Sequence, residues 1–116
     1  MNHEDVVKMG LTQVHAMCDE VQSLGEKVIA YWAEVKDLHQ DELRRAEAIT
    51  TCAKLSERAL DLVTKASVLA NCLCSSLEDR KQYNAVIHNA LKALSGGYAK
   101  LLQMQKALGE LMGDSE

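Results

Sequence analysis

The sequence predicts an all-α fold, an elongated antiparallel bundle of three long helices, from three observations. Valine recurs every seven residues near the start of the chain, at positions 7, 14, 21, 28 and 35. Leucine-rich columns with the same spacing recur further along, and the 116 residues include no proline. A seven-residue apolar period matches two turns of an α-helix, so each column forms one stripe on one helix face. Proline would interrupt such helices by removing a backbone donor.

The valine column predicts a first helix over residues 3–38. The positions three and four residues after each valine are largely apolar and include Tyr31 and Trp32, so we expect a buried face three columns wide. Gly10 and Gly25 fall in the same columns. We expect them to admit a bulky side chain such as Trp32, or Tyr98 of a neighbouring helix. The valine column breaks at residues 38–41, which predicts a turn there. Asp41 is the expected N-cap of the next helix.

A second helix is predicted over residues 41–75 from three columns of its own. The columns are Leu55, Leu62 and Leu69; Cys52, Ala59, Ala66 and Leu73; and Ile49, Val63, Ala70 and Leu77. The second column would continue onto Arg80, which lies between Asp79 and Lys81, so the helix is expected to end near residues 75–81. Ser75 and Glu78 have the spacing of a capping box, which supports a new helix start there.

The third helix is predicted over residues 77–112, with Gly113 as its C-terminal stop. Its expected buried face has three columns: Ile87, Leu94, Leu101 and Leu108; Ala90, Gly97, Met104 and Leu111; and Leu91, Tyr98, Gln105 and Met112. The pair Gly96-Gly97 is the main ambiguity, because two adjacent glycines are typical of a turn. A turn there would give a four-helix bundle. The leucine column keeps its phase from Leu94 to Leu101, which favours one continuous helix.

Composition and charge limit the classes of function. The whole chain, residues 1–116, is of the size of one domain. A formal net charge of −4 without a basic stripe argues against nucleic-acid binding. No apolar run approaches the ~20 residues that span a bilayer, and the first residues lack the layout of a signal peptide. We expect no membrane partner and a cytoplasmic location, or delivery to a host cytosol without a cleaved signal.

Neither the cysteines nor the histidines form a recognisable catalytic or metal-binding pattern. No two of the four cysteines make a Cys-x-x-Cys pair, and Cys72 and Cys74 point about 200° apart on a helix. Reduced thiols acting as small apolar side chains are the favoured interpretation. No histidine follows an acid by three residues, as di-iron bundles require. The sequence therefore predicts no enzyme, no metal and no cofactor.

The favoured functional hypothesis is a non-enzymatic protein–protein interaction module. Residues 66–77 carry no charge, and Val68 and Cys72 lie away from the core columns. Small neutral residues on the outside of a helix suit close contact with another helix, although a solvent-exposed surface of small residues explains them equally well. The predicted partner-binding residues are Val68, Ala70, Cys72, Ser75 and Ser76. The partner is another protein or a second copy of the chain, and the role is that of an adaptor, chaperone, inhibitor or complex subunit.

Two alternative functions remain open. His88 has Lys92 one turn later and Gly96-Gly97 beyond it, which resembles the phosphorylatable site of histidine phosphotransfer domains. The resemblance implies His88 as phosphoacceptor, but those domains have lysine three residues after the histidine and glycine directly following. In this chain the lysine comes four residues later and the glycine later still. The other alternative is a scaffold or membrane-surface protein that uses its helices lengthwise.

Overall fold

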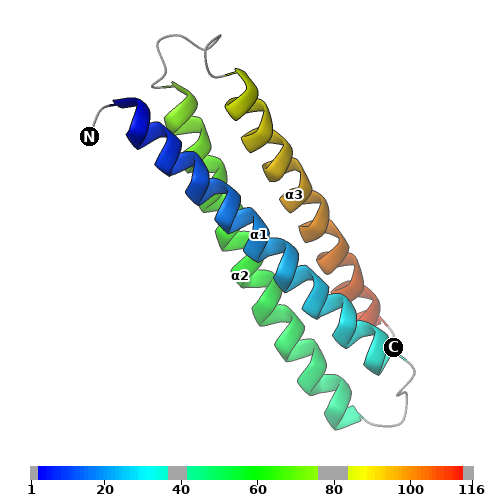
Figure 1. Ribbon diagram of the computed structural model, residues 1–116. Coiled ribbons are helices and arrows are strands. Elements are labelled where there is room, and N and C mark those ends of the chain that lie inside the picture. Colours follow the sequence, from blue (N-terminus) through cyan, green and yellow to red (C-terminus); the bar gives the residue numbers. More distant parts are fainter. Residues whose placement is uncertain (1–2, 37–41, 76–83, 114–116) are drawn as a thin grey trace.

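The computed structural model describes residues 3–36, 42–75 and 84–113, and these form three long helices. They are α1 (His3–Val35), α2 (Glu42–Ser75) and α3 (Asn84–Gly113). The helices lie side by side in a bundle of 59 × 21 × 17 Å, with α2 antiparallel to α1 and α3 (Figure 1). This arrangement confirms the predicted elongated three-helix bundle.

The described helices lie within the predicted ranges 3–38, 41–75 and 77–112, apart from one residue at the end of α3. α1 begins at His3 and α2 ends at Ser75 as predicted, and α3 ends one residue later than predicted, at Gly113. α1 ends at Val35, three residues early, and the amide of Lys36 still donates a 2.9 Å hydrogen bond to the Trp32 carbonyl. The proposed N-cap Asp41 and residues 77–83, including Glu78 of the capping box, lie outside the described residues.

α3 runs without interruption through Gly96 and Gly97, so the four-helix alternative is wrong. Both neighbouring helices stabilise this segment. A Cβ on Gly97 would lie 3.7 Å from Val63 of α2 and 3.8 Å from Cys18 of α1, which is ordinary packing distance. The carbonyl of Gly96 accepts a 2.9 Å hydrogen bond from the Gln22 side chain. These tertiary contacts offset the low helix propensity of two glycines.

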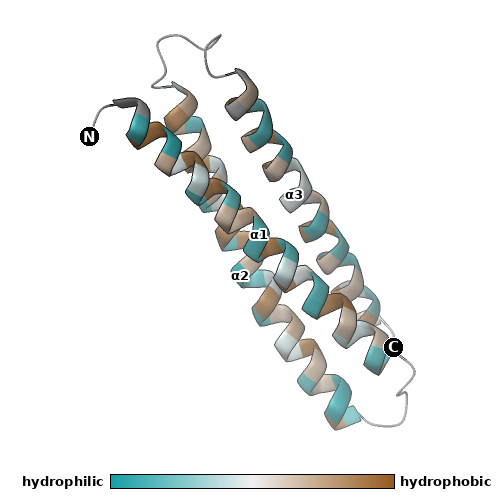
Figure 2. Cartoon of the chain, in the orientation of Figure 1, coloured by the Kyte–Doolittle hydropathy of each residue, from teal (hydrophilic) through white to brown (hydrophobic). Residues whose placement is uncertain are grey.

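The core runs the length of the bundle, and its largest continuous contribution is the valine column of α1. All five valines of the column are at most 3% exposed, which confirms the sequence prediction. α2 contributes mostly small residues, and α3 contributes larger ones. The buried side chains of α2 include Ala48, Cys52, Ala59, Ala66 and Ala70, and those of α3 include Leu94, Leu101, Met104 and Leu111. Hydrophobic and hydrophilic stretches accordingly alternate along each helix (Figure 2).

Two predictions about buried residues are wrong. The column Leu91, Tyr98, Gln105 and Met112, expected in the core, is exposed along α3. Tyr31, expected to point inward from α1, is exposed as well, while Trp32 beside it packs against the core. In a bundle of three helices each helix contacts only two neighbours, so the buried arc is narrower than the apolar pattern suggests.

The glycines on α1 do lie at helix–helix contacts, but their neighbours differ from those expected. Gly10 is covered by the branched end of Leu73 from α2, and Gly25 is covered by the aliphatic stem of Lys100 from α3. Neither Trp32 nor Tyr98 fills these places. Leucine and lysine reach across because their side chains are long and unbranched at Cβ.

Candidate interaction site

The C-terminal part of α2 presents an uncharged outer face, as the sequence predicted. Val68 is 59% exposed, and Cys72 and Ser75 are exposed too. Between residues 66 and 75 the chain carries no charged side chain. We call the exposed set Val68, Cys72 and Ser75 the α2 patch. Ser76, which was also predicted to bind the partner, lies outside the described residues.

Ala70 does not belong to this outer face. It is 2% exposed and packs with Val14 and Cys18 of α1 and Leu94 of α3. Ala70 lies four and seven residues after Ala66 and Val63, which are also buried, so helical geometry places all three on the inner side. An alanine at this position lets the helices approach closely, and any role in partner binding is indirect.

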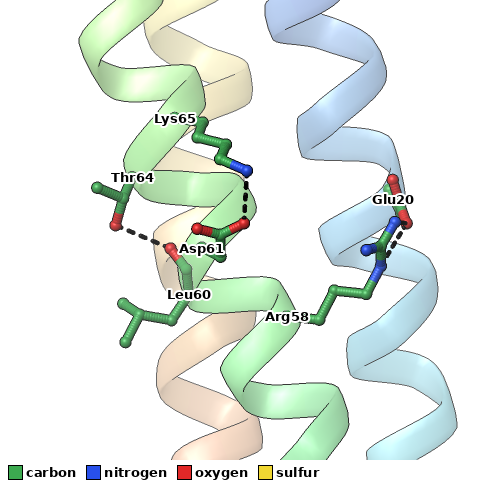
Figure 3. Close-up of polar contacts among 6 residues, drawn as sticks. All are labelled: Glu20, Arg58, Leu60, Asp61, Thr64 and Lys65. Atoms are coloured by element: carbon green, nitrogen blue, oxygen red, sulfur yellow. Dashed lines mark hydrogen bonds and ion pairs between the residues drawn. The ribbon is translucent and has the colours of Figure 1, made fainter.

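A band of charged side chains borders the α2 patch towards the middle of the helix. Lys65 forms a 2.9 Å ion pair with Asp61 one turn earlier, and Arg58 Nε donates a 2.9 Å hydrogen bond to Glu20 Oε1 on α1 (Figure 3). The hydroxyl of Thr64 donates a 2.8 Å bond to the Leu60 carbonyl, which satisfies its polar group within the helix. The α2 patch is therefore an apolar, neutral surface with a charged rim, as in protein interfaces.

The four cysteines fall into two pairs with different surroundings, and all four are free thiols. Cys18 and Cys52 are buried, and burial raises the pKa of both thiols; Asp19 raises the pKa of Cys18 further. Cys72 is exposed, and Cys74 is partly buried. Within residues 3–36, 42–75 and 84–113, no three histidine, cysteine or acidic side chains are grouped closely enough to hold a metal ion.

The alternative phosphoacceptor, His88, is exposed on α3, and Lys92 one turn later is exposed too. Both side chains are accessible to a macromolecular donor. The two glycines that the resemblance depends on lie two turns from His88, and they face the α1 side and the core. In the motif that His88 resembles, the glycine lies beside the histidine. In this chain the two glycines do not.

Sequence reasoning missed a shallow hollow between α1 and α3. It has a volume of about 250 Å³ and is lined by Ile29, Trp32, Gln103, Lys106, Ala107 and Glu110. This volume is smaller than the ~300–1,000 Å³ that is usual for ligand pockets. Lys36 lies over the Trp32 ring, with its Nζ 4.6 Å from the ring centroid. The hollow combines residues about 75 positions apart, so no local pattern could reveal it.

Sequence reasoning also missed an exposed apolar stripe on α3. Leu91, Tyr98 and Leu102 are 53%, 46% and 66% exposed, and they are spaced by seven and four residues along one side of the helix. We call these three residues the α3 stripe. The sequence pattern places Leu91 and Tyr98 in a predicted core column, whereas Leu102 belongs to none of the predicted columns.

Comparison with known proteins finds no matching family model, no matching curated protein and no matching solved structure. Across its described residues, the chain has no helix with the length and hydrophobicity needed to span a bilayer. The function is therefore inferred from the exposed surfaces of the bundle.

Proposed function

We propose that this chain is a non-enzymatic protein–protein interaction module that binds a partner protein through the α2 patch. The observation that carries the proposal is the exposure of Val68 within a stretch that has no charge over three helical turns. A partner helix can approach such a surface closely because serine and cysteine have short side chains. Burying the patch removes apolar area from water without removing a charge from it.

The charged rim supports selectivity for the right partner. Charges at the edge of an apolar patch mainly affect association rate and partner choice rather than affinity. Asp61 and Lys65 lie at this edge and pair with each other in the free chain. A partner with the complementary order of charges can exchange this pair for intermolecular ones, whereas other partners meet like charges.

The test is partner capture with two matched double variants. Val68→Glu with Cys72→Glu places two charges in the α2 patch, and Leu43→Glu with Thr50→Glu places two charges on exposed positions near the other end of the same helix. We expect the first variant to lose a partner that the wild type and the second variant retain. All three proteins are first compared by circular dichroism, because an unfolded variant would lose partners trivially. Equal capture of the same partners by both variants would show that the α2 patch is not the binding surface.

Histidine phosphotransfer remains a second candidate because His88 is exposed on a helical bundle. The wild type and His88→Gln are incubated with a small-molecule phosphodonor and with a phosphorylated response regulator. Acid-labile phosphate on the wild type alone supports this function. A wild type that takes up no phosphate excludes it.

A further inference from the structure

We propose that two copies of this chain associate face to face through the outer surface of α2 and α3. In this dimer, α2 of each copy lies opposite α3 of the other. The proposal goes beyond binding at the α2 patch, because it adds the α3 stripe; on α2 the two surfaces are neighbours, since Thr64 and Asn71 lie one turn from Val68. The proposed interface lies on the sides of α2 and α3 that no neighbouring helix covers.

On α2, the side chains show where the neighbours are. Arg58 reaches Glu20 of α1, whereas Val63 lies beside Gly97 of α3. At 100° per residue, Leu60 is about 200° from Arg58, so it points away from α1. Figure 3 shows Leu60 and Arg58 on opposite sides of the helix. Leu60 is 48% exposed and belongs to the outer surface next to α3.

The same argument orients α3. The stem of Lys100 covers Gly25 of α1, so the Lys100 side of the helix faces α1. Tyr98 lies about 200° from Lys100, and Leu91 and Leu102 lie within about 40° of Tyr98. The α3 stripe therefore points away from α1, on the same side of the bundle as Leu60. Together these residues form one surface that neither α1 nor any other described part of the chain covers.

This α2–α3 face carries no charge along its middle. Its described residues are Ala53, Leu60, Thr64, Ser67 and Asn71 on α2, and Leu91, Ser95, Tyr98, Leu102, Gln105 and Gly109 on α3. The face is about 30 Å long and about 20 Å wide from helix rise and spacing. Because protruding side chains add to the accessible area, this size is comparable to the ~800 Å² that each partner buries in a standard interface.

The charges at the two edges of the face argue for a second copy as the occupant. Glu57 lies at the outer edge of α2, one turn from Leu60. Lys106 lies at the outer edge of α3, one turn from Leu102, and it also lines the hollow between α3 and α1. Both are exposed, and neither forms an ion pair with any described residue of its own chain. Glu57 and Lys106 are the charged residues closest to the face; Lys54 and Asp61 lie beside Glu57, and Glu110 lies beside Lys106. A half-turn rotation about an axis along the bundle places α2 over α3, with Glu57 of one copy at the same edge as Lys106 of the other.

The heights of these two residues agree with this pairing. Val63 of α2 and Gly97 of α3 lie side by side, so they mark the same height along the bundle. Measured along the bundle axis from this height, Glu57 is about 9 Å away and Lys106 is about 13 Å away in the same direction. Rotation about the long axis keeps heights unchanged, so Glu57 and Lys106 of the other copy differ by only about 4–5 Å along the axis. A lysine side chain spans this offset. Rotation about an axis across the helices would instead bring the lysine-bearing edges of two α3 helices together, with Lys92 and Lys106 on both.

Sedimentation velocity of the full chain over a concentration series at low salt tests the interface. We expect a reversible monomer–dimer equilibrium for the wild type, and at least a tenfold weaker association for Leu91→Glu with Leu102→Glu. The matched control is Val6→Glu with Met9→Glu, which places two charges on exposed apolar positions of α1. We expect this control to dimerise like the wild type. A wild type that stays monomeric at millimolar concentration, or a control that dissociates equally, overturns the proposal.

A charge exchange tests the arrangement within the dimer. Glu57→Lys alone and Lys106→Glu alone should each weaken association about threefold to tenfold, because each places like charges together. The two substitutions combined should restore it. Failure of the combination to restore dimerisation overturns the pairing of α2 with α3. Partner capture by the Leu91→Glu, Leu102→Glu variant separates this proposal from the proposed function. If this variant is monomeric and still captures the partner, dimerisation and partner binding are independent.

Discussion

The side chain of Leu73 on α2 lies directly over Gly10 on α1. A Cβ built on Gly10 would be 2.5 Å from Leu73 Cδ1 and 2.9 Å from its Cδ2. A side chain at position 10 would therefore force the end of Leu73 to move. The constraint comes from this close approach and not from backbone conformation, since no glycine in the described helices has a positive φ.

We expect Gly10→Ala to destabilise the bundle by about 1–2 kcal/mol in chemical unfolding. Forcing Leu73 out of its position costs about 1–3 kcal/mol, and the higher helix propensity of alanine offsets up to about 1 kcal/mol of this. Gly109→Ala is the matched control, because a Cβ there meets nothing within 4 Å. It should stabilise the protein by about 0.5–1 kcal/mol. If both substitutions stabilise the protein equally, Leu73 does not occupy this site in solution.

The ion pair between Arg58 and Glu20 joins α1 to α2, but it should contribute little to stability. Its side chains are 58% and 41% exposed, so water and salt screen the interaction. In a double-mutant cycle with Arg58→Ala and Glu20→Ala, we expect a coupling free energy below about 1 kcal/mol that decreases further in molar salt. A larger coupling that does not depend on salt would contradict this expectation.

Removal of the Ser56 hydroxyl should stabilise the protein. Its Oγ is buried and has no hydrogen-bond partner in the described part of the chain, so it loses hydration without compensation. We expect Ser56→Ala to raise the free energy of unfolding by about 1 kcal/mol, part of it from helix propensity. Ser95→Ala, at an exposed position of α3, measures the propensity part alone. A loss of stability at Ser56 would show that the hydroxyl is satisfied in solution.

The buried thiols predict a loss of stability at alkaline pH. Burial raises the pKa of Cys18 and Cys52, so the folded chain holds these protons to higher pH than the unfolded chain. Their contribution to stability is complete below the ordinary thiol pKa and decreases as pH rises above it, from about pH 9 upwards. We expect the free energy of unfolding to decrease more steeply over this range for the wild type than for Cys18→Ala with Cys52→Ala.

Cys72→Ala is the control for this alkaline titration, because Cys72 is exposed. This variant should follow the wild-type pH profile, since it keeps both buried thiols. The lysines and tyrosines are common to all three proteins, so they do not contribute to a difference between the profiles. Identical slopes for the wild type and the variant lacking both buried cysteines would contradict the prediction.

Helix positions and the main core columns could be derived from the sequence because the relevant physics is local. The seven-residue valine period requires no knowledge of other segments, and all five valines are buried as expected. The continuity of α3 through Gly96-Gly97 was also predicted from the unbroken leucine phase. The exposure of Val68 and Cys72 followed from their position outside the columns.

Periodicity and composition are enough to predict the all-α class, the three helices and the uncharged character of the outer side of α2. Which apolar columns are buried depends on how the helices pack. Tyr98 and Leu101 have equally regular columns, yet Leu101 is 5% exposed and Tyr98 is not buried. The reason is physical: a helix with two neighbours has a buried arc set by their directions, and its own sequence does not encode those directions. The α2–α3 face, with Glu57 at one edge and Lys106 at the other, likewise depends on where the three helices lie relative to one another.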